Sequence, residues 1–300
     1  MDIIRRRQFS PVLLVLALAN FAMLASAKSY DNIEYSRAAG NSLQFDAWVP
    51  DGPGPFPVVI IVHGGAWVSG DRRLSVEPLF EPLSEAGFAW FSISYRLAKS
   101  IDPASVANSV ASLLALGTAV DDVREAVAYV RMHASEYHVD PNRIALLGES
   151  AGAQLASMAA LKPSAGGAVQ AVIAFYSPSD LVNLLDANPR VPASMRQALR
   201  ESAFGDMLFA GLRDLSPVSW VRKDSPPFLL IHGTRDMLVP FEQSKAMCDA
   251  MRAAGSSCEL YPVDGGGHGL RWWESVPGQT AYKQVMVRWL DTKLRQPKQN

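Results

Sequence analysis

Residues 144–152 read Ile-Ala-Leu-Leu-Gly-Glu-Ser-Ala-Gly, an apolar run that passes directly into a Gly-x-Ser-x-Gly pentapeptide. The apolar run predicts a buried strand, and the small residues from Ala153 onward predict a helix. A serine at such a turn sits on a strained backbone, and the flanking glycines leave room for neighbouring chain to pass. The pattern favours Ser150 as a nucleophile, against the plainer interpretation of a turn serine that caps a helix.

On either side of this turn, strand-like apolar runs alternate with segments of helical period. This order is typical of an α/β fold with a mostly parallel sheet that is covered by helices on both faces. We expect a hairpin at 33–35 and 43–49, then strands over 57–62, 89–95, 143–147, 171–176, 228–231 and 258–263. Helices are expected over 121–136, 153–161, 243–254 and 282–294.

The segment over residues 178–224 interrupts this alternation. It is rich in Leu, Ala and Met and contains several prolines. We interpret it as an inserted helical lid over the strand ends, with a run of surface loop as the alternative. Since no repeat or low-complexity tract divides the chain, residues 28–300 are expected to form a single catalytic domain.

The composition excludes one class of partner. The 300 residues are 49% hydrophobic and 19% charged, which is enough apolar material for a full core. Lys and Arg number 28 and Asp and Glu number 29, so the net charge is −1. Because no basic field is available to hold a phosphate backbone, nucleic acid is not expected as a partner.

The first 27 residues have the parts of an export signal. Arg5-Arg-Arg7 forms a positive region, residues 11–24 are almost wholly apolar, and Ala25-Ser-Ala27 fits the small-x-small cleavage rule. A retained membrane anchor is disfavoured because the apolar run is shorter than the roughly 20 residues that span a bilayer. We expect cleavage after Ala27, a periplasmic or secreted protein, and no stable membrane insertion afterwards. The arginine pair leaves the choice between the Sec and twin-arginine routes open.

Two cysteines, Cys248 and Cys258, lie ten positions apart. An exported chain meets an oxidising compartment, which permits a disulfide between them. The alternative is two separate buried thiols, and only geometry can decide between the two. Two cysteines alone do not suggest a metal site, and no metal is expected.

A serine hydroxyl needs a base to become a good nucleophile, and five histidines are available. His268 follows a run of three glycines just after the last predicted strand, so its imidazole could reach a neighbouring turn. We expect His268 to be the base. His63 and His232 each end a strand before a glycine and are expected to brace their loops, whereas His133 and His138 are expected at the surface.

An orienting carboxylate should lie between the serine and the histidine in the chain, as is usual with this kind of turn. Asp236 fits, because it follows the predicted strand over 228–231. Its expected task is to hold the imidazole tautomer and to stabilise the imidazolium. Asp180 and Asp264 are the alternatives.

The predicted strand over 57–62 leads into the glycine-rich stretch His63-Gly-Gly-Ala-Trp67. Few side chains intervene there, so backbone N–H groups could face a reacting carbonyl and stabilise its oxyanion. The alternative is a tight turn with no further role.

Together these motifs resemble the α/β-hydrolase superfamily, and more narrowly the hormone-sensitive-lipase-like and feruloyl-esterase-like (BD-FAE type) carboxylesterases. The resemblance runs from about residue 56 to residue 294. The motifs that carry it are His63-Gly-Gly-Ala-Trp67, Ser94-Tyr-Arg-Leu97, Gly148-Glu-Ser-Ala-Gly152, His232-Gly-Thr-Arg-Asp236 and Gly267-His-Gly269.

The resemblance implies an α/β-hydrolase fold with a small helical lid and a catalytic triad. It also implies that no cofactor is needed. The triad would be Ser150, Asp236 and His268, and the oxyanion hole would consist of the amides of Gly65, Ala66 and Ala151. The chain departs from many lipase-like relatives at two positions of these motifs, where Ala66 replaces Gly and Glu149 replaces Asp.

The implied function is hydrolysis of a small-molecule carboxylic ester by an exported serine hydrolase, through an acyl-enzyme intermediate. Short-chain or aromatic acyl esters are preferred because the chain is compact. An arylformamidase-type amide hydrolase is the enzymatic alternative. A non-catalytic binding module is the alternative from another class, and it is disfavoured because Ser150 and His268 are both present. The oligomeric state is left open.

The size of the substrate depends on apolar residues of the lid segment and on three tryptophans. We expect them to line an apolar pocket, and the alternative is that they pack the lid onto the body. These residues are Leu184, Leu185, Met195, Leu199, Phe204, Met207, Leu208, Phe209, Leu212, Trp67, Trp272 and Trp273.

Overall fold

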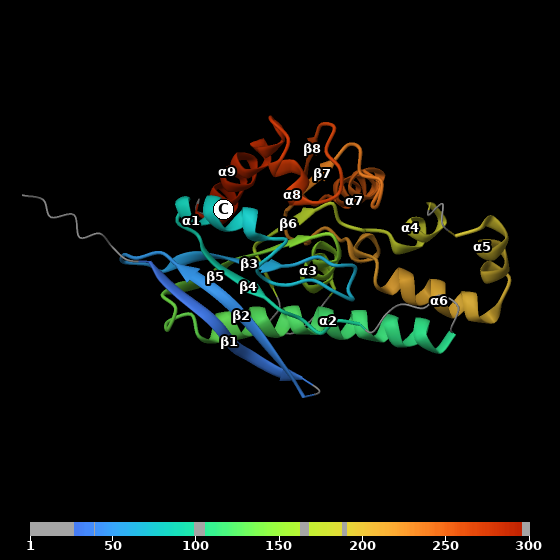
Figure 1. Cartoon of the computed structure of the whole chain (residues 1–300), viewed down its shortest axis with the longest axis horizontal. Helices are drawn as coiled ribbons and strands as arrows, with labels where there is room; N and C mark the ends of the chain where they lie inside the picture. The colour runs from blue at the N-terminus through green and yellow to red at the C-terminus, as the bar shows by residue number, and fades with distance from the viewer. Residues whose placement is uncertain (1–26, 39, 99–105, 163–167, 188–190, 296–300) are drawn as a thin grey trace, which may run out of the picture.

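The computed structural model describes residues 27–38, 40–98, 106–162, 168–187 and 191–295 of the chain. In this part of the chain the strands form one eight-stranded sheet of order β1-β2-β4-β3-β5-β6-β7-β8 (Figure 1). The β1–β2 and β2–β4 pairs are antiparallel, and every other neighbouring pair is parallel. The expected mostly parallel sheet is therefore confirmed.

The strands are β1 (Lys28–Ala38), β2 (Asn41–Val49), β3 (Phe56–Val62), β4 (Ala89–Ile93), β5 (Val139–Glu149), β6 (Ala171–Phe175), β7 (Phe228–Gly233) and β8 (Cys258–Val263). The helices are α1 (Phe80–Glu85), α2 (Val106–Met132), α3 (Ala151–Leu161), α4 (Leu181–Ala187), α5 (Ala193–Arg200), α6 (Ala203–Asp214), α7 (Glu242–Ala253), α8 (Leu270–Glu274) and α9 (Tyr282–Leu294).

The central strands are apolar along their whole length because both faces of the sheet are covered. In β3, Val58, Ile60 and Val62 join the core cluster that contains residues of α2, α3 and α7. Val59 and Ile61 point to the opposite face and join the cluster with residues of α1, α8 and α9. Successive side chains of a strand thus fill two cores, one on each side of the sheet.

The segment over 178–224 contains α4, α5 and α6, followed by a 3-10 turn over Pro217–Trp220. Its three helices lie together at one end of the molecule, away from α1 and α9 (Figure 1). Helix α4 begins shortly after the carboxyl end of β6, and α6 packs against α2. The segment is therefore helical, which the loop alternative did not predict.

Several element boundaries differ from the sequence prediction, including those of β1, which spans Lys28–Ala38 instead of residues 33–35. Helix α2 begins at Val106, well before the expected residue 121, and ends at Met132 instead of residue 136. Strand β5 begins at Val139 instead of residue 143, because Val139 still pairs with β3. Strand β4 stops at Ile93, before Tyr95. Ser94 still donates its N–H to Gln44 of β2, but the N–H of Arg96 is bound by Asp122 of α2.

Cys248 of α7 and Cys258 at the start of β8 are joined by a disulfide bond, with their Cα atoms 5.3 Å apart. Neither thiol is free. The bond ties a covering helix to the last strand of the sheet.

The export signal expected over residues 1–27 lies, up to residue 26, outside the described residues. Strand β1 begins at Lys28, directly after the expected cleavage position. Among the helices of the described ranges, none combines the length and the apolar composition that crossing a membrane requires.

Candidate active site

Ser150 occupies the turn between β5 and α3 with φ 52° and ψ −121°. A positive φ is unfavourable for a residue with a Cβ and costs on the order of 1–3 kcal/mol. The strain is held in place because the N–H of Ser150 donates to the carbonyl oxygen of Phe175, 2.9 Å away at the end of β6. The turn therefore fixes the direction of the serine side chain.

The glycines on both sides of Ser150 are required by close backbone packing. A methyl group on Gly148 would lie 2.3 Å from the carbonyl oxygen of Gly152. A methyl group on Gly152 would lie 2.2 Å from the carbonyl oxygen of Val62, at the end of β3. The turn over residues 148–152, called the elbow below, thus packs directly against β3, the strand that precedes the other glycine-rich loop.

Three side chains that are far apart in the sequence meet at the carboxyl end of the sheet. The Oγ of Ser150 lies 2.9 Å from Nε2 of His268, and Nδ1 of His268 lies 2.6 Å from Oδ2 of Asp236. His268 follows β8 and Asp236 follows β7, so parallel strands bring both residues to one edge. The residues nominated from the sequence as nucleophile, base and acid form one continuous hydrogen-bonded chain.

The carboxylate of Asp236 is buried and fully engaged. Its Oδ1 accepts the N–H groups of Leu238 and Val239 at 2.8 and 2.9 Å, which leaves Oδ2 for His268. Burial alone would raise the pKa of Asp236, but hydrogen bonds from His232, His268 and the Val239 amide outweigh it. The pKa of Asp236 consequently lies well below its usual range, and the group is ionised at neutral pH.

The two alternative acids are occupied elsewhere. Asp180 accepts the N–H of Asn183 at the start of α4, and Asp264 accepts a hydrogen bond from Thr234 at 3.3 Å. The ring nitrogens of His268 are bonded to Ser150 and Asp236 instead.

His63 and His232 are buried and brace their loops, as predicted. His63 contacts the carbonyl oxygen of the next residue at 2.7 Å and stacks on Tyr95 with ring centroids 4.4 Å apart. His232 lies between the hydroxyl of Ser244 and the carbonyl oxygen of Val239, at 2.7 and 2.9 Å, and its Nε2 also lies 3.4 Å from Oδ2 of Asp236.

The surface prediction is confirmed for His138, which is exposed, and only in part for His133. His133 is half-buried because its ring stacks on Tyr129 one helical turn earlier, with ring centroids 4.0 Å apart.

The loop after β3 has three successive residues with positive φ, namely Gly65 at 118°, Ala66 at 51° and Trp67 at 64°. A side chain at Gly65 would lie 2.0 Å from the carbonyl oxygen of Ser69, so only glycine fits. The amide N–H groups of Gly65, Ala66 and Ala151 make no hydrogen bond with any described residue. They are the three donors nominated from the sequence for an oxyanion.

Two residues at the site were not given a role from the sequence. Glu149 is buried beside Ser150, and its carboxylate accepts hydrogen bonds from the Gly64 amide and the Tyr176 phenol. The ring of Tyr176 lies 4.6 Å from that of His268. The sequence offers one signal for Tyr176: it directly follows β6, the strand next to β5, which carries Ser150 at its end.

The three tryptophans nominated for an apolar pocket lie in different environments. The indole of Trp67 donates to Gln154 on α3 at 3.0 Å, and Gln154 donates to the carbonyl oxygen of Leu215 after α6 at 2.7 Å. Trp273 is buried in the core, whereas Trp272 is 61% exposed. Trp67 is thus the tryptophan that connects the glycine-rich loop to the segment over 178–224.

The apolar residues of that segment also do not share one environment. Phe209 is buried, Met195 and Met207 are exposed, and the others are partly exposed. Phe209 has the guanidinium of Arg200, from α5 of the same segment, over its ring, while the two methionines are left at the surface of the segment.

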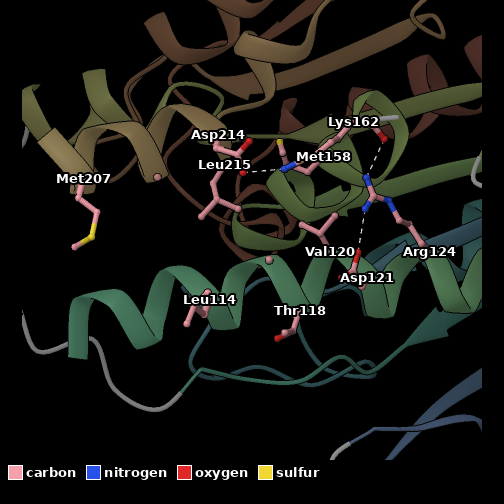
Figure 2. A pocket seen from close by; sticks show the side chains of 12 residues that line it. Leu114, Thr118, Val120, Asp121, Arg124, Met158, Lys162, Met207, Asp214 and Leu215 are labelled. Atoms are coloured by element: carbon pink, nitrogen blue, oxygen red, sulfur yellow. Dashed lines mark hydrogen bonds and ion pairs between the residues drawn. The ribbon is translucent and has the colours of Figure 1, made fainter. Parts of the chain in front are cut away.

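A cavity of about 580 Å³ lies between α2, α3 and α6 (Figure 2). It is apolar near Leu114 and Met207 and carries paired charges at Asp121 and Arg124. The lining residues include none of the triad. The chemistry of the site is therefore argued from the triad and the glycine-rich loop, not from this cavity.

In the described ranges, no group of three or more His, Cys, Asp and Glu side chains is arranged to hold a metal ion. The charged groups at the site are instead engaged with each other and with backbone amides.

Comparison with protein families gives one family for most of the chain. The family model described as BD-FAE matches residues 45–251. Among curated sequences, the probable carboxylic ester hydrolase LipM of Mycobacterium tuberculosis is 34% identical over 76% of this chain and 52% of its own length. The esterase LipQ of the same organism is 34% identical over 68% of this chain and 48% of its own length. The chain spans about half the length of these curated relatives.

Solved structures agree on the fold. A truncated carbohydrate esterase from gut microbiota superposes with a TM-score of 0.69 at 24% identity, covering 91% of this chain and 98% of that chain. A thermophilic esterase of the planctomycete Thermogutta terrifontis superposes with a TM-score of 0.67 at 24% identity, covering 92% and 95%. The fold is thus an α/β-hydrolase fold.

Proposed function

Because the chain belongs to the BD-FAE family, we propose that it is a serine hydrolase that cleaves carboxylic esters. The observation that carries this proposal is the hydrogen-bonded chain from Ser150 through His268 to Asp236, with distances of 2.9 and 2.6 Å. A hydroxyl within hydrogen-bond reach of an oriented imidazole is the arrangement that activates a serine for acyl transfer.

In the proposed mechanism, His268 takes the proton of Ser150 while the serine oxygen attacks the ester carbonyl carbon. The amides of Gly65, Ala66 and Ala151 stabilise the oxyanion of the tetrahedral intermediate. His268 then gives its proton to the departing alcohol, and Ser150 is left acylated. Water, with His268 again as base, releases the carboxylic acid and restores the serine hydroxyl.

The charge on Asp236 supports both halves of this mechanism, because His268 becomes an imidazolium in each. When His268 becomes an imidazolium, the buried carboxylate at 2.6 Å stabilises its positive charge. The depressed pKa of Asp236 keeps that carboxylate ionised across the pH range in which the histidine works.

We further propose that the preferred substrates are esters of short-chain or aromatic acids. Trp67 follows the proposed oxyanion donor Ala66 and packs against a cluster of Leu116, Leu181 and Leu215. Since Gln154 also fixes the indole, the side of the loop next to this cluster is filled by protein. We infer that this packing limits the length of the acyl chain on that side of the loop.

We also propose that residues 28–300 form one catalytic domain, that residues 178–224 form its lid, and that the protein is exported. The parts of an export signal within residues 1–27 support the export proposal. The Cys248–Cys258 disulfide is in keeping with it, because such bonds persist in oxidising compartments.

Ser150→Ala tests the proposed reaction. Hydrolysis of p-nitrophenyl acetate and labelling by a fluorophosphonate probe should both be lost in this variant, with an unchanged circular dichroism spectrum. Substantial residual turnover would contradict the role of Ser150.

In the wild-type protein, turnover should fall as the acyl chain of p-nitrophenyl esters lengthens from acetate to palmitate, and formyl-kynurenine should be a poor substrate.

A further inference from the structure

The carboxylate of Glu149 is buried directly before Ser150, yet the mechanism above gives it no task. Its residue is only 5% exposed. Oε1 accepts the N–H of Gly64 at 3.0 Å, and Oε2 accepts the phenol of Tyr176 at 2.5 Å. Burying a carboxylate is costly unless such hydrogen bonds compensate it, and an apolar residue of similar size would often be more favourable for stability. A role beyond packing is therefore worth seeking.

Tyr176 extends the contact of Glu149 to a third segment. Its phenol oxygen accepts the N–H of Leu270 at 3.1 Å, two residues after His268. The residue is fully buried, and its ring lies against the imidazole of His268. Burial raises the pKa of Tyr176 well above its usual value, and the negative charge of Glu149 adds to this. The phenol thus remains protonated and donates to Glu149.

The backbone of Tyr176 also indicates that its position is strongly determined. Its φ is +36°, in a region that residues with a Cβ rarely adopt. Its N–H donates to the carbonyl oxygen of Ile231 on β7 at 2.8 Å, which holds this conformation. Strained residues that the surrounding structure fixes in this way cluster at functional sites.

We propose that Glu149 and Tyr176 are positioning residues that hold the glycine-rich loop and the His268 loop in register with Ser150. Glu149 is covalently joined to the serine, binds the glycine-rich loop at Gly64, and reaches the His268 loop through the phenol of Tyr176. Three segments that come from β3, β5 and β8 are thereby tied to one carboxylate. The proposal rests on the proposed function, since it assigns a task within that reaction.

The register matters because acyl transfer depends on the relative positions of nucleophile, base and oxyanion donors. A displacement of about 1 Å can cost on the order of 100-fold in rate. Ground-state binding of a small ester depends less on this register. The loss of the link should therefore lower kcat more than it raises KM.

Tyr176→Phe is the first test, because it removes the hydroxyl and keeps the ring against His268. We expect kcat for p-nitrophenyl acetate to fall about tenfold or more, with KM changed less than about twofold. Glu149→Gln keeps the side-chain volume, but an amide has one acceptor oxygen for two donors, so it should give a similar loss. The double variant should be no slower than the slower single variant, because each change breaks the same link.

Tyr35→Phe is the matched control. Tyr35 is also buried, and its hydroxyl donates to the carbonyl oxygen of Ser94 at 2.6 Å, from β1 at the opposite edge of the sheet. This variant loses a buried hydrogen bond and some stability but should keep the wild-type kcat. If Glu149→Gln does not fold, the kcat of Tyr176→Phe compared with the kcat of Tyr35→Phe still tests the proposal.

The outcomes separate the two proposals. If Ser150→Ala abolishes hydrolysis while Tyr176→Phe and Tyr35→Phe both keep the wild-type kcat, the positioning role is wrong and the proposed function stands. If the loss of kcat in the double variant equalled the product of the two single losses, the two residues would act independently, and the common link would be wrong. A wild-type protein that hydrolyses no ester would overturn the function and the positioning role together.

Discussion

The orientation of the triad side chains is fixed by hydrogen bonds with neighbouring backbone groups and with each other. The strained backbone of Ser150 is held by a hydrogen bond from its N–H to the carbonyl oxygen of Phe175 on β6, and its hydroxyl lies beside His268. Asp236 presents one carboxylate oxygen to two backbone amides and the other to His268. The orientation of the carboxylate is therefore set by the backbone, and the carboxylate in turn sets the tautomer of the imidazole.

This orientation makes Asp236→Asn a sharp test. The amide oxygen of Asn would take the place of Oδ1, which faces the N–H groups of Leu238 and Val239. The NH₂ group would then face Nδ1 of His268 and favour the tautomer that cannot accept the proton of Ser150. We expect kcat for p-nitrophenyl acetate to fall about 10⁴-fold.

Asp264→Asn is the control for that prediction, because Asp264 contacts Thr234 and not the triad. It should keep near wild-type turnover. If Asp236→Asn were as active as Asp264→Asn, the assigned acid would be wrong.

His63 gives a pH dependence of stability that is separate from catalysis. Burial lowers the pKa of His63, although the carbonyl of Gly64 and the charge of Glu149 act in the opposite direction. A histidine with a lowered pKa in the folded state stabilises the protein fully above its unfolded pKa of about 6.5. That contribution is lost as the pH falls from this value through the folded pKa.

We therefore expect the free energy of unfolding to decrease from pH 7.5 to pH 5.5, and to decrease less in His63→Asn than in the wild-type protein. Urea unfolding at the two pH values measures the difference. His138→Asn is the control, because His138 is exposed and its φ of +55° suits asparagine. An equal loss of stability in wild type and His63→Asn would contradict the prediction.

At the scale of elements, the sequence predicts best those segments whose ends are marked by turn residues or whose apolar side is continuous. Strand β8 and helix α9 have the predicted bounds, because one is bounded by turn residues and the other keeps an apolar side along its length. The first half of α2 was missed. Residues 106–120 carry small and apolar side chains without a clear helical period, and this helix has neighbours on more than one side, including β1, α3 and α6.

The candidate site shows the same limit. Ser150 and His268 lie in glycine-rich turns after strands, and chain order points to Asp236, so local sequence is enough to nominate them. Tyr176 lacks such a pattern. Its contacts with Glu149 and Leu270 join segments that are 27 and 94 residues away, and only the folded chain brings them together.

Two glycines in helices should respond in opposite ways to replacement by alanine. Gly117 lies in α2 with open space around an added methyl group, whereas a methyl on Gly152 in α3 would collide with the carbonyl oxygens of Val62 and His63. Gly117→Ala should raise the free energy of unfolding by about 1 kcal/mol, because alanine favours the helix.

Gly152→Ala should lower the free energy of unfolding by several kcal/mol or prevent folding, because backbone atoms of β3 cannot move aside easily. Chemical denaturation of the two variants measures both effects. A stable and active Gly152→Ala variant would show that the elbow can separate from β3, contrary to the packing described.

At the scale of the whole molecule, two of the three triad residues follow the last two strands along the chain, at one edge of the sheet, whereas Ser150 follows the central strand β5. Strands β7 and β8 carry Asp236 and His268 in the loops that follow them, and β8 is an edge strand with β7 as its one neighbour in the sheet. The Cys248–Cys258 disulfide ties this edge strand to α7. The bond should therefore protect the half of the site that contributes the base.

Replacing both cysteines by alanine tests how much the disulfide contributes to the free energy of unfolding. Closing a loop of this length contributes about 2–3 kcal/mol to stability, mainly by restricting the unfolded chain. The melting temperature should fall by roughly 5–10 °C. At 25 °C kcat should be unchanged, because the pairing of β8 with β7 and the hydrogen bond between Asp236 and His268 are kept.

Reducing agent supplies the control for the double cysteine variant. Dithiothreitol should lower the melting temperature of the wild-type protein toward that of the variant and leave the variant unchanged. Equal melting temperatures of the two proteins without reducing agent would mean that the bond does not stabilise the fold. A folded variant with a strongly reduced kcat at 25 °C would instead mean that the disulfide positions His268, because the only covalent change lies ten residues before it at Cys258 and further back at Cys248.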